Sequence, residues 1–477
     1  MVFKNRADRR RILLINPPND LGMGEGSFNA VIDIYQPLGL AYIAAVLERA
    51  GYEVRVVDSK VENLSNSEII RRILEFRPFI VGLTSSTPDF SSARSLAGQI
   101  KASGDYIILI GGRHVSALPE ETMQEGCFDY GIIGEGENTV VELAQAISTG
   151  NLQQLPQIKG IVFRDGSKIL CTPPREYIQD LDTLPFPARH LFPPLSKYTY
   201  LYYKSLPLAT IITSRGCPYQ CTFCDRAVFG NRVRMRSINN ILDEIEMLVK
   251  DYGVRSINIP DDLFTLPSER LEEFCRQLLS RKLKISWSCF SRVDSVTPQI
   301  LKIMKQAGCW MIGYGIESGN EKSLEAIKKD AGIEKAKKAL EATRRVGIRS
   351  LGFFILGLPG EEEEDVLNTL TFANKLPLDR VVFFMTQPFP GSEMYRMLLS
   401  QGRLNRGVDY RYYHNFCFPG KLSFVTEGLT VDILEKYRKK AYRDFYLRPG
   451  YIFRQFLNNP EIANLPTRVK AFLKAVW

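Results

Sequence analysis

Short apolar strands alternate with amphipathic helices along most of this 477-residue chain, and this alternation restricts the possible folds more than any other feature. In the first part, strands are expected at residues 11–16, 52–58, 79–86, 106–112 and 130–137. Strands that are apolar along their whole length are typical of a parallel sheet with helices on both faces. The pattern predicts that residues 1–150 form a doubly wound, Rossmann-like (flavodoxin-like) α/β domain, which binds ligands at the carboxyl ends of its strands.

Six further pairs of a strand and a helix follow between residues 206 and 400. Their strands are expected at 208–214, 256–262, 285–292, 310–318, 350–357 and 380–388. Repeated right-handed units of this kind form a barrel or part of one, with the chemistry at the carboxyl ends of the strands. We expect a partial (β/α)6 TIM-like barrel here, a hairpin and proline-rich linker at 151–205, and a mainly helical region at 401–477.

Composition narrows the class of protein. The net charge is +9, 45% of the residues are hydrophobic, and no apolar stretch approaches the length of a membrane span. Nine scattered cysteines form no disulfide framework and suit a reducing compartment, so a cytoplasmic protein is expected. With only three histidines, His114, His190 and His414, the chemistry is not expected to depend on histidine. Cofactors are expected to supply it.

Three cysteines follow the first strand of the second half in a CxxxCxxC pattern, at Cys217, Cys221 and Cys224. Structural zinc takes four ligands in a closed tetrahedron, and no fourth Cys or His lies nearby to complete one. A four-iron cluster held by three cysteines keeps one iron open for a small molecule. Gly216 lets the backbone turn closely around a bulky group. The pattern favours an open iron-sulfur site over a zinc knuckle or a chance group of cysteines.

At this spacing, and in a loop after a strand, the sequence resembles the radical S-adenosylmethionine (SAM) superfamily. The resemblance implies that the three cysteines hold a [4Fe-4S] cluster with SAM on the open iron, and that Phe223, beside the sulfurs, contacts SAM. In the family, the reduced cluster cleaves SAM to a 5′-deoxyadenosyl radical, so an electron donor such as flavodoxin or ferredoxin is implied. Arg215, Arg234 and Arg236 either neutralise the cluster or pair at the surface.

Polar residues punctuate the carboxyl ends of the barrel strands. They are Asp261 and Asp262 after the second strand, Arg292 after the third, and Glu317 with Ser318 after the fourth. By resemblance, one of the two aspartates holds the amino group of SAM, Arg292 its carboxylate, and Glu317 and Ser318 its ribose or carboxylate side. The alternative for each is a helix cap or a salt bridge at the rim.

The first domain resembles the cobalamin-binding domain that precedes the barrel in one branch of radical SAM enzymes. The resemblance rests on small hydroxyl residues after the third strand, Ser85 and Ser86, and a glycine pair after the fourth, Gly111 and Gly112. Such positions leave room for the nucleotide tail of the cofactor. The other strand ends that would face it carry Asn16, Pro17, Thr84, Gly134, Glu135 and Gly136.

One element of the cobalamin pattern is missing. The histidine that would give cobalt a lower ligand should follow the first strand, where this chain reads NPPNDLGMGEG. The resemblance therefore implies cobalamin without a histidine from that motif on cobalt. His114, in a GGRH turn, either touches the corrin rim or approaches the cobalt, or it caps local backbone. The alternative for the whole domain is a Rossmann-like module that has lost its cofactor and only docks substrate.

Together these features predict a cobalamin-dependent radical SAM enzyme that methylates an unactivated carbon of a small-molecule or lipid-like substrate. In the family, cobalamin takes a methyl group from one SAM and passes it to a substrate radical made with a second SAM. Other members of this branch carry out oxidative cyclisation, ring modification or carbon-carbon coupling on lipids or tetrapyrroles, and this alternative stays open. A cobalamin or iron-sulfur sensor that binds nucleic acid is disfavoured, because no nucleic-acid-binding motif is present.

The C-terminal region contains two apolar stripes at helical spacing. The first includes Ile433, Tyr437, Ala441 and Phe445, and the second consists of Val469, Phe472, Leu473 and Val476. Because the region is basic and aromatic, it is expected either to rest on a membrane surface or to cap the barrel.

Overall fold

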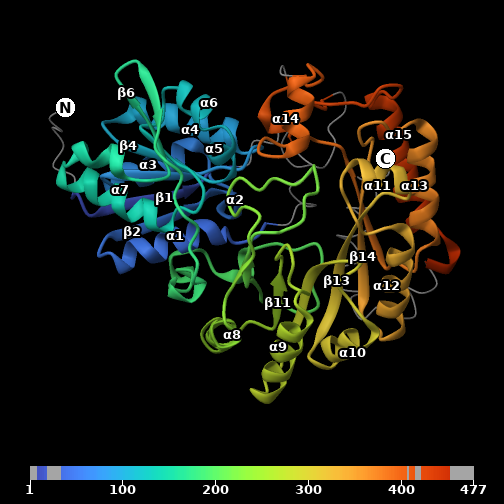
Figure 1. Cartoon of the computed structure of the whole chain (residues 1–477). Helices are drawn as coiled ribbons and strands as arrows, with labels where there is room; N and C mark the ends of the chain where they lie inside the picture. The colour runs from blue at the N-terminus through green and yellow to red at the C-terminus, as the bar shows by residue number, and fades with distance from the viewer. Residues whose placement is uncertain (1–7, 19–33, 406–407, 414–420, 452–477) are drawn as a thin grey trace.

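The computed structural model describes residues 8–18, 34–405, 408–413 and 421–451. Two sheets form two lobes, an N-terminal lobe and a barrel lobe, with the segment around residues 175–235 running between them (Figure 1). Both lobes have the α/β architecture that the alternation of strands and helices predicts.

The N-terminal sheet has seven strands in the order β2-β1-β3-β4-β5-β6-β7. Its five parallel strands are β1 (Arg11–Asn16), β2 (Glu53–Asp58), β3 (Ile80–Thr84), β4 (Ile107–Gly111) and β5 (Tyr130–Ile132). A hairpin of β6 (Ile161–Asp165) and β7 (Lys168–Cys171) continues the sheet antiparallel to β5. The hairpin expected in the linker is therefore part of this sheet.

Helices cover both faces of the N-terminal sheet, as expected for a doubly wound fold. One face packs on α1 (Leu38–Arg49) and α7 (Glu137–Thr149). The other face packs on α3 (Asn66–Phe76), α4 (Phe90–Ser103), α5 (Arg113–Ala117) and α6 (Pro119–Gln124). The short α2 (Ser59–Glu62) follows β2. Local signals agree with these bounds: Ser65 and Glu68 form a capping box at the start of α3.

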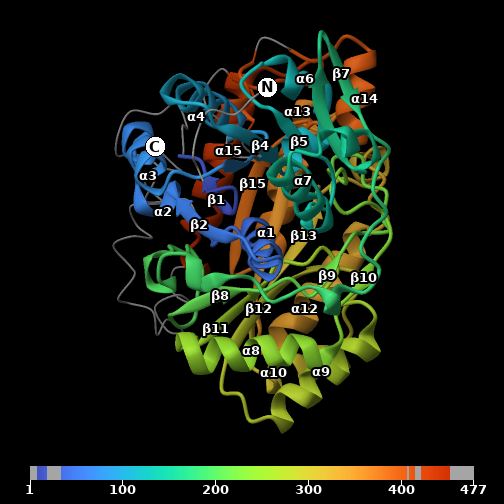
Figure 2. The same ribbon diagram turned by 90° about the vertical axis from the view of Figure 1, so that its left-hand side faces the viewer.

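The second sheet is a partial barrel of six parallel strands in the order β15-β14-β13-β12-β11-β8. The strands are β8 (Leu208–Thr210), β11 (Ser256–Ile259), β12 (Ser286–Arg292), β13 (Cys309–Glu317), β14 (Arg349–Leu356) and β15 (Arg380–Met385). The helices between and after them are α8 (Ile238–Tyr252), α9 (Ser268–Ser280), α10 (Pro298–Gln306), α11 (Glu321–Ala326), α12 (Ile333–Arg345), α13 (Glu363–Lys375) and α14 (Glu393–Ser400). Figure 2 shows the strands with α8, α9 and α10 beneath them. β8 and β15 are the two edges, so the barrel is open between them.

The first barrel strand is shorter than the sequence predicts. It was expected to run to residue 214, but β8 ends at Thr210. Beyond it, the backbone N–H of Thr213 donates to the Asp261 carboxylate instead of continuing the sheet. The chain then forms a separate two-stranded ribbon, β9 (Ser214–Arg215) with β10 (Arg234–Met235).

The C-terminal helix α15 (Val431–Tyr446) covers the exposed edge of β15. The hydroxyl of Tyr442 accepts a hydrogen bond from the backbone N–H of Phe383 at 3.1 Å, and Tyr446 bonds both backbone groups of Val381. The predicted apolar face of this helix thus caps the barrel and is not free for a membrane surface. The second stripe, Val469 to Val476, lies outside the described residues.

Short 3-10 helices complete the described chain: η1 (Leu152–Gln157), η2 (Leu181–Thr183), η3 (Arg189–Leu191), η4 (Leu195–Lys197) and η5 (Tyr410–Tyr412). Among the helices that the structure describes, none combines the length and apolar character needed to cross a bilayer.

Candidate active site

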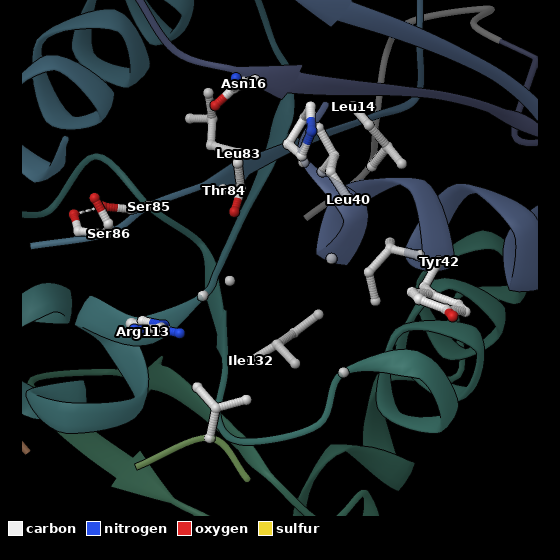
Figure 3. Close-up of a pocket in the computed structure, with 18 of the residues that line it drawn as sticks. Leu14, Asn16, Leu40, Tyr42, Leu83, Thr84, Ser85, Ser86, Arg113 and Ile132 are labelled. Carbon is white, nitrogen blue, oxygen red and sulfur yellow. Dashed lines mark hydrogen bonds between the residues drawn. The ribbon is translucent and has the colours of Figure 1, made fainter. Parts of the chain in front are cut away.

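A cavity of about 650 Å³ lies at the carboxyl ends of the N-terminal strands (Figure 3). Its walls come from these strand ends, from α1 through Leu40 and Tyr42, and from the barrel lobe through Ile212 and Phe229. Nine of the residues predicted to contact cobalamin line it: Asn16, Thr84, Ser85, Ser86, Gly111, Gly112, Gly134, Glu135 and Gly136. Pro17 and His114 are not among the lining residues.

Glycines shape this cavity. A Cβ atom added at Gly39 or Gly111 would meet no other atom within 4 Å, so the open space begins at the backbone itself. Gly112 has a left-handed backbone with φ of 109°, and a Cβ there would come within 2.5 Å of the Ser85 carbonyl oxygen. The close approach of these two strand-end turns therefore requires glycine.

The small hydroxyl residues beside the cavity already have partners within the protein. Ser85 donates to the carbonyl of Ser86 at 2.8 Å, and Ser86 donates to the Asp89 carboxylate at 2.6 Å. Lys60 pairs with the other oxygen of Asp89 at 2.7 Å. These contacts hold the turn after β3 in place and leave only small side chains at the cavity wall.

The structure places His114 away from the cavity. Its fully buried ring stacks on Phe90 with ring centroids 3.9 Å apart and meets the edge of Tyr410 at 4.8 Å. Nδ1 lies 3.4 Å from the Thr87 hydroxyl. Burial lowers the pKa of His114 to about 3, so the ring is neutral. The side chain packs in the core and not at the cavity wall, and its ring makes no hydrogen bond to local backbone within the described residues.

The residues around the cavity fit the nucleotide tail of cobalamin. The space between the sheet and α1 is mainly apolar, with Leu14, Leu40 and Ile43 along it, and glycines leave room at its wall. The described lining contains no histidine, cysteine or methionine, so it offers cobalt no strong side-chain ligand.

The three motif cysteines lie in the loop between β9 and β10, which we call the cluster loop (residues 216–233). Gly216 has φ of 87° and packs against the backbone of Arg232, where a side chain would not fit. The backbone N–H of Cys217 donates to Gly230 O at 3.4 Å and that of Thr222 donates to Ile327 O at 3.0 Å. The loop is therefore closed on itself and tied to the barrel.

The thiols differ in their surroundings. A hydrogen bond from the Cys224 thiol lowers the pKa of Cys221, whereas burial and the nearby Asp262 carboxylate raise the pKa of Cys217. Within the described residues, no three His, Cys, Asp or Glu side chains gather closely enough for a single metal ion.

Two of the residues predicted for SAM stand beside the cysteines. Glu317 ends β13 at a bulge, in a left-handed backbone conformation with φ of 70°, and pairs with Lys329 at 2.9 Å. Arg292 pairs with Asp294 at 2.8 Å and lies over the ring of Tyr219 at 3.6 Å. The charges of Arg292, Glu317 and Lys329 all affect the pKa of Cys221, which puts them near this thiol.

Lys329 and Tyr219 were missed in the sequence. Lys329 is buried, and although burial alone would lower its pKa, the Glu317 carboxylate holds the pKa above its ordinary value. The lysine thus stays charged beside the thiols. Its position follows helix α11, so no strand-end pattern marks it. Tyr219 lies inside the cysteine motif, but the sequence does not show that its ring packs against Arg292.

The other predicted SAM residues have different surroundings. The buried Asp261 carboxylate accepts bonds from Thr213 and Ser214 and so holds the chain that leads into the cluster loop. Ser318 is fully buried and donates to Glu361 at 3.3 Å. Both side chains are engaged by the protein itself. Asp262 is exposed at the same strand end. Phe223 packs on an apolar group that contains Leu324, Ile327, Met394 and Phe424.

The arginines around the motif are buried and paired, so they neither sit at the surface nor face the cluster unpaired. Arg215 binds Glu135 at 2.8 Å and Glu137 at 2.6 Å, and Arg234 binds Glu135 at 2.6 Å. Arg236 binds Glu244, which also pairs with Arg189 at 3.0 Å. Glu135 therefore lines the cavity and also binds Arg215 and Arg234, the residues at the two ends of the cluster loop.

Comparison with protein families gives two matches. The radical SAM superfamily model matches residues 211–373, and the B12 binding domain model matches residues 29–144. The first range contains the cluster loop and most of the barrel. The second contains most of the strand ends that line the cavity.

Known relatives cover nearly the whole chain. An uncharacterized methyltransferase of Pyrococcus horikoshii is 33% identical over 94% of this chain and 95% of its own length. The anaerobic magnesium-protoporphyrin IX monomethyl ester cyclase of Rubrivivax gelatinosus is 28% identical over 98% of this chain and 82% of its own length. The cytidylyl-2-hydroxyethylphosphonate methyltransferase of Streptomyces wedmorensis is 28% identical over 82% of each chain.

Two solved structures have the same fold. The radical SAM methyltransferase TsrM from Kitasatospora setae, with cobalamin and a [4Fe-4S] cluster bound, superposes with a TM-score of 0.71 at 19% identity, covering 92% of this chain and 89% of its own. The cobalamin-dependent SAM radical enzyme OxsB has a TM-score of 0.73 at 18% identity, covering 97% of this chain and 72% of its own.

Proposed function

This chain belongs to the cobalamin-dependent radical SAM family of enzymes, with a [4Fe-4S] cluster, SAM and cobalamin as its cofactors, and we propose that it transfers a methyl group to an unactivated carbon of a small-molecule substrate. One observation carries the proposal. Val228 and Phe229 of the cluster loop form part of the wall of the cobalamin cavity. The segment that holds the radical-generating cofactor therefore borders the space for the methyl carrier.

The residues divide the work between two sites. When bound, the cluster with SAM supplies a 5′-deoxyadenosyl radical, and cobalamin supplies a methyl group. Cys217, Cys221 and Cys224 hold the cluster, while Lys329 and Arg292 place positive charge beside the thiolates. The Arg292 guanidinium packs over the ring of Tyr219 within the same site, which fixes its position for orienting a bound cosubstrate.

The protein's other tasks are orientation and exclusion of water from the radical. We propose that Glu317, held by Lys329, and the exposed Asp262 contact SAM. An electron reaches the cluster from a small donor protein such as flavodoxin or ferredoxin in this proposal. Contact with a membrane surface remains a prediction for residues beyond 451, because α15 packs against the barrel through β15 and α13.

Product stoichiometry tests methylation. The reduced holoenzyme is incubated with SAM carrying a deuterated methyl group and with fractionated metabolites, and S-adenosylhomocysteine, 5′-deoxyadenosine and labelled products are quantified. Methylation predicts equal amounts of S-adenosylhomocysteine and 5′-deoxyadenosine and a product that carries the label. Oxidative cyclisation, the activity named for the Rubrivivax relative, predicts 5′-deoxyadenosine without stoichiometric S-adenosylhomocysteine and would contradict the proposal.

A further inference from the structure

One carboxylate from the cavity wall holds both ends of the cluster loop. Arg215 immediately precedes the loop and Arg234 immediately follows it, and the two residues pair across the β9–β10 ribbon. Oε1 of Glu135 accepts a hydrogen bond from Arg215 at 2.8 Å, and Oε2 accepts one from Arg234 at 2.6 Å. Glu137, the first residue of α7, accepts from the second terminal nitrogen of Arg215 at 2.6 Å.

This arrangement is withdrawn from solvent. The side chains of Glu135 and Arg234 are each 3% exposed and that of Arg215 is 4% exposed. The Arg215 guanidinium also lies over the rings of Tyr42 and Phe229, 5.3 and 5.2 Å from their centroids. In a buried network of this kind, loss of one partner leaves a charge without compensation, so the network resists partial opening.

The same residues face the cofactor cavity. Glu135, Glu137, Arg215, Tyr42 and Phe229 all line it. A molecule that fills the cavity therefore contacts the cluster loop directly through Phe229. It also packs against the carboxylate that secures both ends of that loop.

We infer that Glu135, through Arg215 and Arg234, couples cobalamin binding to the conformation of the cluster loop, so that each cofactor is bound more tightly when the other is present. Such coupling is reciprocal, because the free energy of binding both cofactors does not depend on their order. Glu135 acts here as a positioning residue. The inference rests on the two cofactors of the proposed function but not on the bond that the enzyme makes, so failure of the methylation test leaves it standing.

The test compares two dissociation constants of hydroxocobalamin for the same anaerobic protein, before and after reconstitution of the cluster with iron and sulfide. We expect binding to be about tenfold tighter after reconstitution, within the usual range of coupling between sites. Glu135→Gln keeps the shape of the side chain but removes the charge that both arginines share. In this variant the ratio of the two constants should fall to near one, even if both constants increase.

Glu244→Gln is the matched control. Glu244 also bridges two buried arginines, Arg189 and Arg236, but it lies on α8, outside the cavity lining and the cluster loop. In Glu244→Gln, the ratio of the two dissociation constants should equal that of the parent. A purely structural defect weakens hydroxocobalamin binding equally with and without the cluster. Only loss of coupling therefore changes the ratio of the two dissociation constants.

The reciprocal measurement titrates the iron that the protein retains at equilibrium against increasing concentrations of a chelator. Saturating hydroxocobalamin should raise the chelator concentration that removes half of the iron by about tenfold in the parent and leave it unchanged in Glu135→Gln. Equal dissociation constants in the parent, or an undiminished ratio in Glu135→Gln, would overturn the inference. If Glu135→Gln does not fold, Glu137→Gln replaces it, and this variant must still lower the ratio.

Discussion

The Glu317–Lys329 pair is the most unusual residue-level feature near the cysteines. Both side chains are less than a tenth exposed, and Glu317 adopts a left-handed backbone conformation that residues other than glycine seldom take. Strained and charged positions of this kind persist where function requires them. Their place at the end of β13, beside Cys221, supports a role in holding the cosubstrate of the cluster.

Removing one member of this pair should destabilise the protein strongly. Lys329→Met leaves the buried Glu317 without its partner, which is expected to lower the free energy of unfolding by about 3–5 kcal/mol. Denaturant unfolding of the cofactor-free protein measures this. The control is Arg345→Met, which breaks an exposed pair with Glu341 and should cost less than about 1 kcal/mol. If both substitutions lower the free energy of unfolding equally, burial does not determine how much the Glu317–Lys329 pair contributes to stability.

His114 should give the protein a defined loss of stability in acid. Its pKa is lowered to about 3 by burial, whereas the unfolded chain takes up the proton near the ordinary value of about 6.5. The stabilisation is therefore fully present above the ordinary value and is lost as the pH falls toward 3. At pH 5 the cost is about 2 kcal/mol.

The histidine effect is measured by comparing unfolding at neutral pH and at pH 5 in the cofactor-free parent and in His114→Gln. The loss between the two pH values should be smaller by about 2 kcal/mol in the variant. His190→Gln, at an exposed histidine, controls for removal of an imidazole as such. An unchanged loss in His114→Gln would show that this ring does not cause the acid sensitivity.

At the scale of single elements, α15 is needed because β15 is an edge strand with unpaired backbone groups. The helix satisfies these groups through tyrosine hydroxyls and not through another strand. Tyr442→Phe removes the acceptor for the buried N–H of Phe383 and should cost about 1–3 kcal/mol of stability.

Tyr252→Phe, on α8, is the matched control for the α15 prediction, because its hydroxyl has no hydrogen bond within the described structure. Its free energy of unfolding should change by less than about 0.5 kcal/mol. If Tyr442→Phe proves equally neutral, the helix does not protect the strand edge by hydrogen bonding.

The carboxyl end of β4 should be essential for cobalamin binding but not for assembly of the cluster. Gly111→Leu introduces a side chain into the open cavity without backbone strain, because Gly111 is not in the left-handed region. We expect hydroxocobalamin to bind more than about tenfold more weakly, with unchanged iron content. Gly98→Leu, at an exposed and open position on α4, should leave cobalamin binding unchanged. Normal binding to Gly111→Leu would place the cofactor elsewhere.

The whole molecule shows which features a sequence can predict. Both sheets were predicted because buried parallel strands leave continuous apolar runs such as ILLI in β1 and IILI in β4. The three cysteines of the motif are close together in the sequence, so their spacing alone was sufficient to predict an iron-sulfur site. The cavity lining followed from the rule that strand carboxyl ends meet at one edge.

Long-range pairs left no comparable signal. Arg215 and Glu135 are 80 residues apart, and no periodic pattern relates them. Lys329 faces Glu317 only because α11 returns the chain to the end of β13. His114 follows the cavity glycines in sequence, yet the start of α5 turns it into the core beside Phe90. Such placements depend on tertiary packing, which a single sequence does not display.

The central claim is that one chain holds a [4Fe-4S] cluster and cobalamin in neighbouring sites. The most direct test measures iron, sulfide and corrin per chain after anaerobic purification with saturating hydroxocobalamin. The parent should contain about four irons and one corrin. A variant with Cys217, Cys221 and Cys224 replaced by alanine should lose iron and still take up corrin. Gly111→Leu should keep iron and take up little corrin. Iron without corrin in the parent, or zinc in place of iron, would contradict the account.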